Sequence, residues 1–155
     1  MEFTLRNRQR RIKASWTAIA ARAARAAAHV AARHPEAFAQ IEEIEVTVLS
    51  DARIARVHTE FLDDPTPTDV ITFHHGEILL GAETIASNAA RHGTTLDDEL
   101  LLCIIHGCLH LAGYLDASLR DFRLMKAEQE RILKWLCSPT PARKTLLTRL
   151  PRHVI

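Results

Sequence analysis

Residues 95–116 read TLDDELLLCIIHGCLHLAGYLD, a segment with the pattern of one helix and the turn that ends it. A threonine followed by acidic residues is typical of a helix N-terminus, because its hydroxyl can accept a hydrogen bond from an unpaired backbone N–H group. Gly113 predicts the helix end, since glycine readily adopts the left-handed conformation that terminates helices. The helix expected from about residue 97 to 112 is apolar on nearly every side, which predicts a position at the buried centre of a domain.

Two histidines lie four residues apart on this expected helix, so they project from the same face, one turn apart. Their imidazoles can bind one metal ion, and the turn at Gly113 can bring the carboxylate of Asp116 back to the same face. Three protein ligands with one open position are typical of a catalytic zinc site. The sequence therefore predicts one zinc ion held by His106, His110 and Asp116. The alternative is that both histidines are ordinary helix residues and Asp116 caps the next helix.

The spacing of these three residues matches the metzincin protease signature with two changes. Gly107 replaces the glutamate that serves as general base in such enzymes, which disfavours hydrolysis of peptides or other small substrates by that route. A glycine beside the metal is instead predicted to leave room for a large substrate. Cys103 lies on the same helix face and is either an alternative ligand or a residue that packs beneath the site.

The rest of the chain predicts a small α+β domain. Alternation of apolar and polar residues indicates about four strands, at residues 2–6, 44–49, 69–73 and 77–80. Caps, prolines and glycines delimit the other four of about five helices, at residues 10–34, 51–61, 82–91 and 117–136. We expect a single domain over residues 1–137, with a small mixed sheet packed around the metal-bearing central helix, and a basic, flexible tail over residues 138–155.

Charge is distributed unevenly along the chain. Residues 1–34 carry +7 and residues 138–155 carry +4, which leaves −10 for the middle of a chain whose net charge is +1. Two basic ends suggest contact with a polyanion, while the alternative is a solvated helix face and a disordered tail. The Arg- and Ala-rich N-terminus also has the composition of a transit peptide.

Composition limits the class of protein further. Hydrophobic residues make up 47% of the chain, and no apolar run approaches the roughly 18 residues that a membrane span needs. Three cysteines are too few for a disulfide framework. We therefore expect a protein without membrane contact, in a reducing, cytoplasmic compartment.

Several motifs resemble one known family. Residues 106–114, HGCLHLAGY, resemble the hallmark H-G-x-L-H-L-x-G-Y-D-H of the YbeY-type rRNA maturation factors. Residues 67–73, PTDVITF, are similar to that family's P-T-D-V-L-S-F, and residues 76–78, GEI, resemble its G-D-I. The resemblance spans about residues 45–135. It implies a zinc-dependent, single-strand-specific endoribonuclease that acts on rRNA in ribosome biogenesis, with the small ribosomal subunit as a further partner.

The resemblance also assigns roles within the cleft. It places Thr68 and Asp69 at the cleft edge, where they are predicted to orient a ligating histidine through a hydrogen bond to its imidazole. It aligns the family's third histidine ligand with Asp116, and carboxylate is also a zinc ligand. The basic N-terminal helix is expected to hold the RNA backbone.

Two further positions differ from the family at the loop before residue 67. The resemblance implies an arginine that contacts substrate phosphate or the reaction centre; this arginine aligns with Leu62, and the family's nearby asparagine aligns with His58. Arg53 or Arg56 is a candidate to replace the arginine. Leu62 favours the alternative function, a ribosome-assembly or RNA-binding factor in which the zinc is structural. Three other histidines, His58, His74 and His75, are expected either in the cleft or at the surface.

Overall fold

The computed structural model describes residues 1–138, which form one α+β domain with four strands and five helices. The elements run in the order β1 (Glu2–Asn7), α1 (Trp16–Arg33), β2 (Glu43–Leu49), α2 (Asp51–Leu62), β3 (Val70–Thr72), β4 (Glu77–Gly81), α3 (Ala82–His92), α4 (Leu96–Leu111) and α5 (Leu119–Cys137). The predicted fold class is therefore confirmed. The predicted flexible tail, apart from Ser138, lies outside the described residues.

The four strands form one mixed sheet in the order β1-β2-β4-β3. β1 and β4 both pair with β2 in parallel, while β3 pairs with β4 as an antiparallel hairpin. Gly76 permits this hairpin for two reasons. Its φ of +109° is in the region that favours glycine, and a side chain there would meet the carbonyl oxygen of Glu43 at 2.4 Å. The sheet order leaves β3 as an edge strand.

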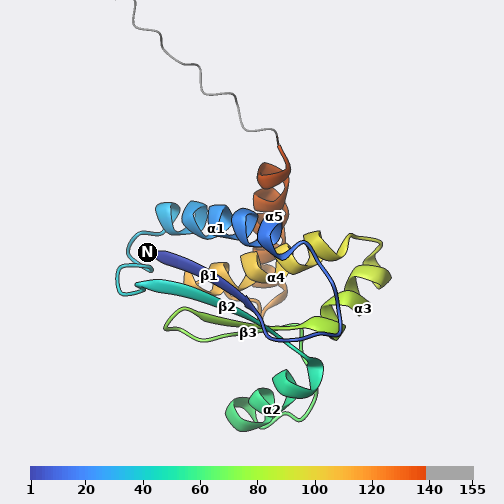
Figure 1. The fold of residues 1–155 in the computed structure, drawn as a ribbon. Coiled ribbons are helices and arrows are strands. Elements are labelled where there is room, and N and C mark those ends of the chain that lie inside the picture. Colours follow the sequence, from blue (N-terminus) through green and yellow to red (C-terminus); the bar gives the residue numbers. More distant parts are fainter. Residues whose placement is uncertain (139–155) are drawn as a thin grey trace, which may run out of the picture.

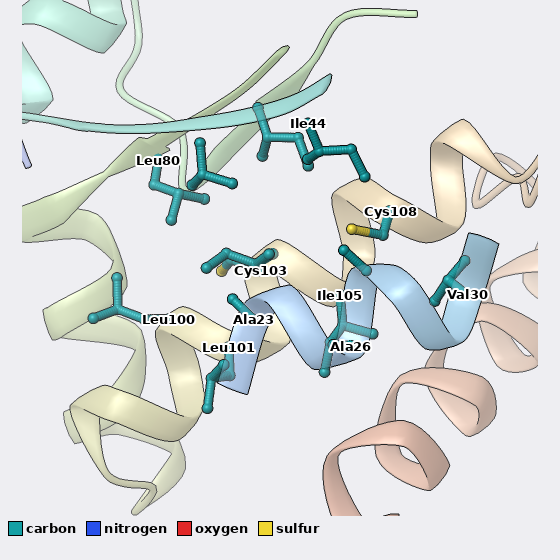
Figure 2. Packing of buried hydrophobic residues seen from close by; sticks show 14 of the residues in the cluster. Ala23, Ala26, Val30, Ile44, Leu80, Leu100, Leu101, Cys103, Ile105 and Cys108 are labelled. Carbon is teal, nitrogen blue, oxygen red and sulfur yellow. The ribbon is translucent and has the colours of Figure 1, made fainter. Parts of the chain in front are cut away.

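The main core lies between one face of the sheet and the helices α1, α4 and α5 (Figure 1). Alanines of α1 pack against α4, as Figure 2 shows for Ala23 and Ala26. Both alanines are fully buried, and their small side chains let the two helices approach closely. α4 contributes ten buried residues to the structure, which confirms the prediction that this helix is central.

Of the helices in the described residues, α2 covers the opposite face of the sheet, and Figure 1 shows it on the other side of the sheet from α1. A second cluster of four buried residues holds it there: Leu49, Ile54, Ile71 and Leu79. Ile54 is the only residue of α2 that is fully buried. The contact between α2 and the sheet is thus much smaller than the contact that positions α4.

The N-terminal helix begins at Trp16, so the prediction of a helix from residue 10 was wrong at its start. The side chain of Gln9 holds residues 9–12 in a turn instead. Its carbonyl oxygen accepts hydrogen bonds from the backbone N–H groups of Arg11 and Ile12, at 2.7 and 2.9 Å. The Arg- and Ala-rich N-terminal segment, which also has the composition of a transit peptide, is part of the fold as β1 and α1.

Two of the basic side chains of α1 contact neighbouring helices. Arg22 donates to the carboxylate of Asp98 at 3.2 Å, and the guanidinium of Arg25 lies 5.2 Å from the ring centre of Trp135. A cation over an aromatic face is stabilised by the negative charge density of the ring. Among the described residues, no helix is long and apolar enough to cross a membrane.

Candidate metal centre

The C-terminal half of α4 and the turn after it build the candidate site. The hydroxyl of Thr95 accepts from the backbone N–H of Asp98 at 3.1 Å and so caps the start of the helix. The helix ends at Leu111, and Gly113 follows with a φ of +92°. This left-handed residue reverses the chain, which brings Asp116 back beside the last turn of the helix.

Three side chains converge at this turn: His106, His110 and Asp116, here called the His–His–Asp group. The two Nε2 atoms lie 2.9 Å apart, and an Asp116 carboxylate oxygen lies 3.5 and 3.6 Å from them. Ligands about 2.0–2.1 Å from a tetrahedral zinc ion are roughly 3.3 Å from one another. The observed separations are close to that value, so the group could hold a metal ion.

Both imidazoles are oriented through their other nitrogen. Nδ1 of His106 lies 3.2 Å from the side-chain oxygen of Gln129, and Nδ1 of His110 lies 3.0 Å from the carbonyl oxygen of Tyr114. Since both partners are acceptors, each Nδ1 carries the proton and donates it. Each Nε2 then has a lone pair directed at the space between the two rings, where a metal ion would bind both.

Sequence reasoning missed Gln129, although its position gives a signal. In α5, Met125, Ile132 and Leu136 are buried, and Gln129 lies on the same helical face. A polar residue on the apolar face of an amphipathic helix needs a polar partner inside the domain. That pattern could have identified Gln129 as a residue that contacts the site.

The His–His–Asp group lies where two hollows meet. The first has a volume of about 420 Å³ and the second about 770 Å³. Both are lined by Asp69, Val70, His106 and Asp116, so two of the three candidate ligands form part of the wall between them. A chain molecule that passes the group can therefore occupy space on both sides of it.

Thr68 and Asp69 both line the first hollow, at the edge of β3. The Asp69 carboxylate accepts from the backbone N–H of Val70 at 2.9 Å and from the hydroxyl of Thr68 at 3.4 Å. Within the described residues, the hydrogen bonds of the two imidazole Nδ1 atoms go to Gln129 and Tyr114. An orienting role for Thr68 and Asp69 stays a prediction.

The wall opposite α4 carries the two positions that differ from the resembled family. Leu62 and His58 both line the first hollow, and Leu62 is 61% exposed. His74 lines this hollow as well, whereas His75 lies outside it and stacks on Phe73. The structure thus places an exposed apolar side chain where an arginine was expected from the resemblance.

The two arginines considered as replacements line neither of these hollows in the described structure. Arg53 instead donates to the backbone carbonyl of Arg8 at 3.3 Å. Arg56 is one turn nearer to Leu62 but is also absent from both linings. No arginine therefore replaces the missing one at the walls of the hollows formed by residues 1–138.

Gly107 has a different role from the one predicted for it. It is buried and faces the sheet, where a side chain would lie 2.8 Å from Cδ1 of Ile78 and 3.0 Å from the hydroxyl of Thr72. The glycine thus makes room for the sheet, which lets α4 approach β3 and β4 closely. The expectation that it leaves space for substrate was wrong, because the substrate-sized hollows lie on other sides of the helix.

Cys103 is buried beneath the site and lines the second hollow. Burial raises the pKa of its thiol well above the ordinary value, and the nearby charges of Asp69 and Glu99 raise it further. The protonated thiol is a poor metal ligand. Its sulfur is also absent from the converging group, which favours the packing role over that of an alternative ligand.

Comparisons with known proteins identify the family of this chain. The family model described as endoribonuclease YbeY matches residues 4–136. A relative from Micrococcus luteus named endoribonuclease YbeY is 37% identical over 131 residues, which cover 72% of this chain and 83% of the relative. A protein of the same name from Porphyromonas gingivalis is 36% identical over 116 residues, which cover 70% and 75%.

A solved structure supports the fold independently. The solution structure of TM1509 from Thermotoga maritima matches with a TM-score of 0.57 and 22% identity, over 92% of this chain and 99% of that one. At that identity the likeness concerns the fold alone. Together with the family match over nearly all the described residues, these findings show that the chain belongs to the endoribonuclease YbeY family.

Proposed function

We propose that this chain is a zinc-dependent, single-strand-specific endoribonuclease that acts in rRNA maturation and ribosome biogenesis in the cytoplasm. The observation that carries the proposal is the pair of Nε2 atoms of His106 and His110, which face one another beside the Asp116 carboxylate. The hollows on both sides of this group have the size for nucleotides of one RNA strand. The proposed partners are rRNA and the small ribosomal subunit.

Zinc is the metal that fits this donor set best, since imidazole nitrogen and carboxylate oxygen are its usual ligands in catalytic sites. When bound, the ion would supply Lewis acidity at a phosphate oxygen and lower the pKa of a water in the fourth position. Gln129 and the Tyr114 carbonyl hold the two imidazoles in the tautomer that presents Nε2 to the metal. Asp116 leaves the loaded site with a net charge of +1, which still attracts phosphate.

The surrounding residues position the RNA strand. Lys126 lines the second hollow, where its ammonium lies 3.1 Å from the Glu130 carboxylate, and we assign it to a phosphate next to the scissile one, for which it would exchange that carboxylate. The basic residues of α1 give a further surface for the RNA backbone, in addition to their contacts with α4 and α5. Thr68 and Asp69 lie at the edge of the first hollow, where we assign them to orient substrate or an imidazole.

One observation favours a second function. The first hollow has Leu62 at the position of the family's arginine, and no arginine side chain of the described residues lines either hollow. Without that cation, the developing negative charge on phosphate has one fewer stabilising group. The second candidate is therefore a ribosome-assembly or RNA-binding factor in which the zinc is structural and cleavage is slight or absent.

A cleavage assay on single-stranded and structured RNA separates the two candidates. We expect the wild type to cleave the single strand, and chelator or His106→Ala to abolish cleavage while circular dichroism shows the fold intact. His75→Ala is the matched control, since this imidazole lies outside both hollows. If His106→Ala unfolds and neither protein cleaves RNA, the enzyme assignment is wrong and the structural-zinc factor is supported.

A further inference from the structure

The outer edge of β3 forms one wall of the first hollow. β3 is the last strand of the sheet, and five consecutive residues line the hollow, from Thr68 to Thr72. Neighbouring side chains of a strand point to opposite faces of a sheet. A hollow lined by every residue of such a run therefore meets the edge of the strand, where peptide groups are exposed, rather than one of its faces.

Two hydrogen bonds fix which peptide groups of this segment face outward. The N–H of Gly81 donates to the carbonyl oxygen of Asp69 at 2.9 Å, and the N–H of Phe73 donates to that of Glu77 at 2.8 Å. In an antiparallel ladder, residues that face the partner strand alternate with residues that face away from it. The odd-numbered residues of this segment thus pair with β4, and the even-numbered ones turn their N–H and C=O groups to the outer edge.

The outward groups belong to Val70 and Thr72. The N–H of Val70 is already used, because it donates to the Asp69 carboxylate at 2.9 Å. Three groups remain along the edge: the Val70 carbonyl, the Thr72 N–H and the Thr72 carbonyl. They form a row of acceptor, donor and acceptor in the same hollow as the His–His–Asp group. An unpaired peptide N–H beside a bound substrate is a strong hydrogen-bonding group.

We propose that this edge binds the Watson–Crick edge of an unpaired nucleobase next to the scissile phosphate and thereby selects single-stranded RNA. This inference rests on the proposed function and names the determinant of its specificity. Each nucleobase has a hydrogen-bond donor and an acceptor side by side on that edge, which match a peptide N–H next to a C=O. In a duplex the same base atoms are occupied by the pairing strand, so only an unstacked, unpaired base can bind.

An extended peptide is a poorer occupant of this edge. A peptide that adds a strand to a sheet needs a repeating row of N–H and C=O groups. β3 has three residues in its ladder, and the first of its outward N–H groups is capped by Asp69. The remaining groups suffice for one base but not for a new strand.

The amide signals of the wild-type protein test the proposal directly. We would titrate the zinc-loaded, ¹⁵N-labelled full chain with a short single-stranded RNA that has hydrolysis-resistant linkages, and with the same RNA annealed to its complement. The Thr72 amide should shift downfield with the single strand and stay in place with the duplex. The amides of Ile71 and Phe73, which the ladder already uses, are internal references. A Thr72 amide that stays unmoved at saturating RNA, or responds equally to the duplex, overturns the proposal.

A pair of variants tests the same group by affinity. Thr72→Pro removes the N–H, and proline is tolerated on an edge strand where that N–H faces outward. Thr72→Val removes only the hydroxyl and keeps the N–H. We expect Thr72→Pro to bind single-stranded RNA about ten-fold more weakly than Thr72→Val, the value of one hydrogen bond. Equal affinities of the two folded variants would contradict the proposal.

The outcomes separate this inference from the proposed function. If RNA is cleaved but the Thr72 amide does not respond, the β3 edge does not select single-stranded RNA. The proposed endoribonuclease function is then still supported. If the Thr72 amide responds to the single strand but no RNA is cleaved, the edge binds bases in a protein that is an RNA-binding factor. Should Thr72→Pro fail to fold, the amide titration of the wild type decides alone.

Discussion

The two walls of the first hollow differ in how firmly the core holds them. α4 carries His106 and His110 and has ten buried residues, whereas α2 carries Leu62 and has one. The two histidines of the candidate site thus lie on the helix whose position is fixed by packing against the sheet, α1, α3 and α5. Leu62 and His58, which differ from the resembled family, lie on the helix with the fewest buried residues. Since Leu62 is exposed, a substitution there costs little stability and changes mainly the chemistry of the hollow.

The largest effect should come from truncating the core under each wall at a matched position. Ile104 in α4 and Ile54 in α2 are the same residue type and both fully buried. We expect Ile104→Ala to lower the free energy of unfolding by about 4 kcal/mol, because its densely packed surroundings cannot collapse into the cavity. Ile54→Ala should cost about 2 kcal/mol, since the small cluster under α2 can relax. Denaturant unfolding of both variants gives these values. Equal losses in the free energy of unfolding would show that the core holds α4 and α2 equally firmly.

A smaller effect, on zinc affinity, should follow from removing Gln129, the hydrogen-bond partner of His106 on α4. Gln129→Ala leaves the imidazole Nδ1 without its acceptor, so zinc affinity should fall by about 10- to 100-fold. Gln129→Glu keeps an acceptor oxygen and should bind zinc at least as tightly as the wild type. Competition with a chromophoric chelator measures both affinities. If Gln129→Ala binds zinc like the wild type, the hydrogen bond does not orient the ligand.

Gly107 gives the next test of how closely α4 must approach the sheet. Gly107→Ala should destabilise the fold by about 1–3 kcal/mol, because the added methyl group meets the buried Ile78 side chain. Zinc affinity should fall with it, since the shift of the helix also moves His106. Thermal unfolding with and without zinc measures both effects. A Gly107→Ala variant as stable as the wild type would show that a methyl group fits between α4 and Ile78.

Substitution of Leu62 on α2 should have the smallest effect on the free energy of unfolding, within about 0.5 kcal/mol. Leu62→Arg adds a cation to the first hollow, where it can stabilise charge on a reacting phosphate. We expect RNA cleavage to rise about ten-fold or more in kcat/KM, with no change in zinc content. Leu62→Met, of similar size and uncharged, is the control. If both variants cleave equally, the cation at this position has no catalytic effect.

Most elements of the fold could be predicted because their sequence patterns are local. The apolar run before Gly113 predicts α4, and the alternation around Val46 predicts β2. The start of α1 could not be predicted, since it depends on which backbone groups the Gln9 side chain binds. The side of α4 on which Gly107 lies is likewise set by tertiary packing, which residue spacing within one helix does not reveal.

The metal ligands of the candidate site could be predicted from local sequence patterns, but the residues around them could not. The convergence of His106 and His110 follows from helical spacing. The position of Asp116 follows from the chain reversal at Gly113, since glycine commonly ends helices in this way. Gln129 is 23 residues from His106 in the sequence and reaches it only because α5 packs on α4. The free edge of β3 depends on the order of the strands, which is a property of the whole sheet.

The zinc content of the purified protein shows whether His106, His110 and Asp116 hold a metal ion. Elemental analysis of the wild type should find about one zinc ion per chain, because three donors of a tetrahedral site already converge. His110→Ala should lose the metal, and Asp116→His should keep it, since histidine is an equivalent ligand at the same turn. A wild type that holds no zinc even after reloading, or a His110→Ala variant that holds as much as the wild type, would contradict the assignment.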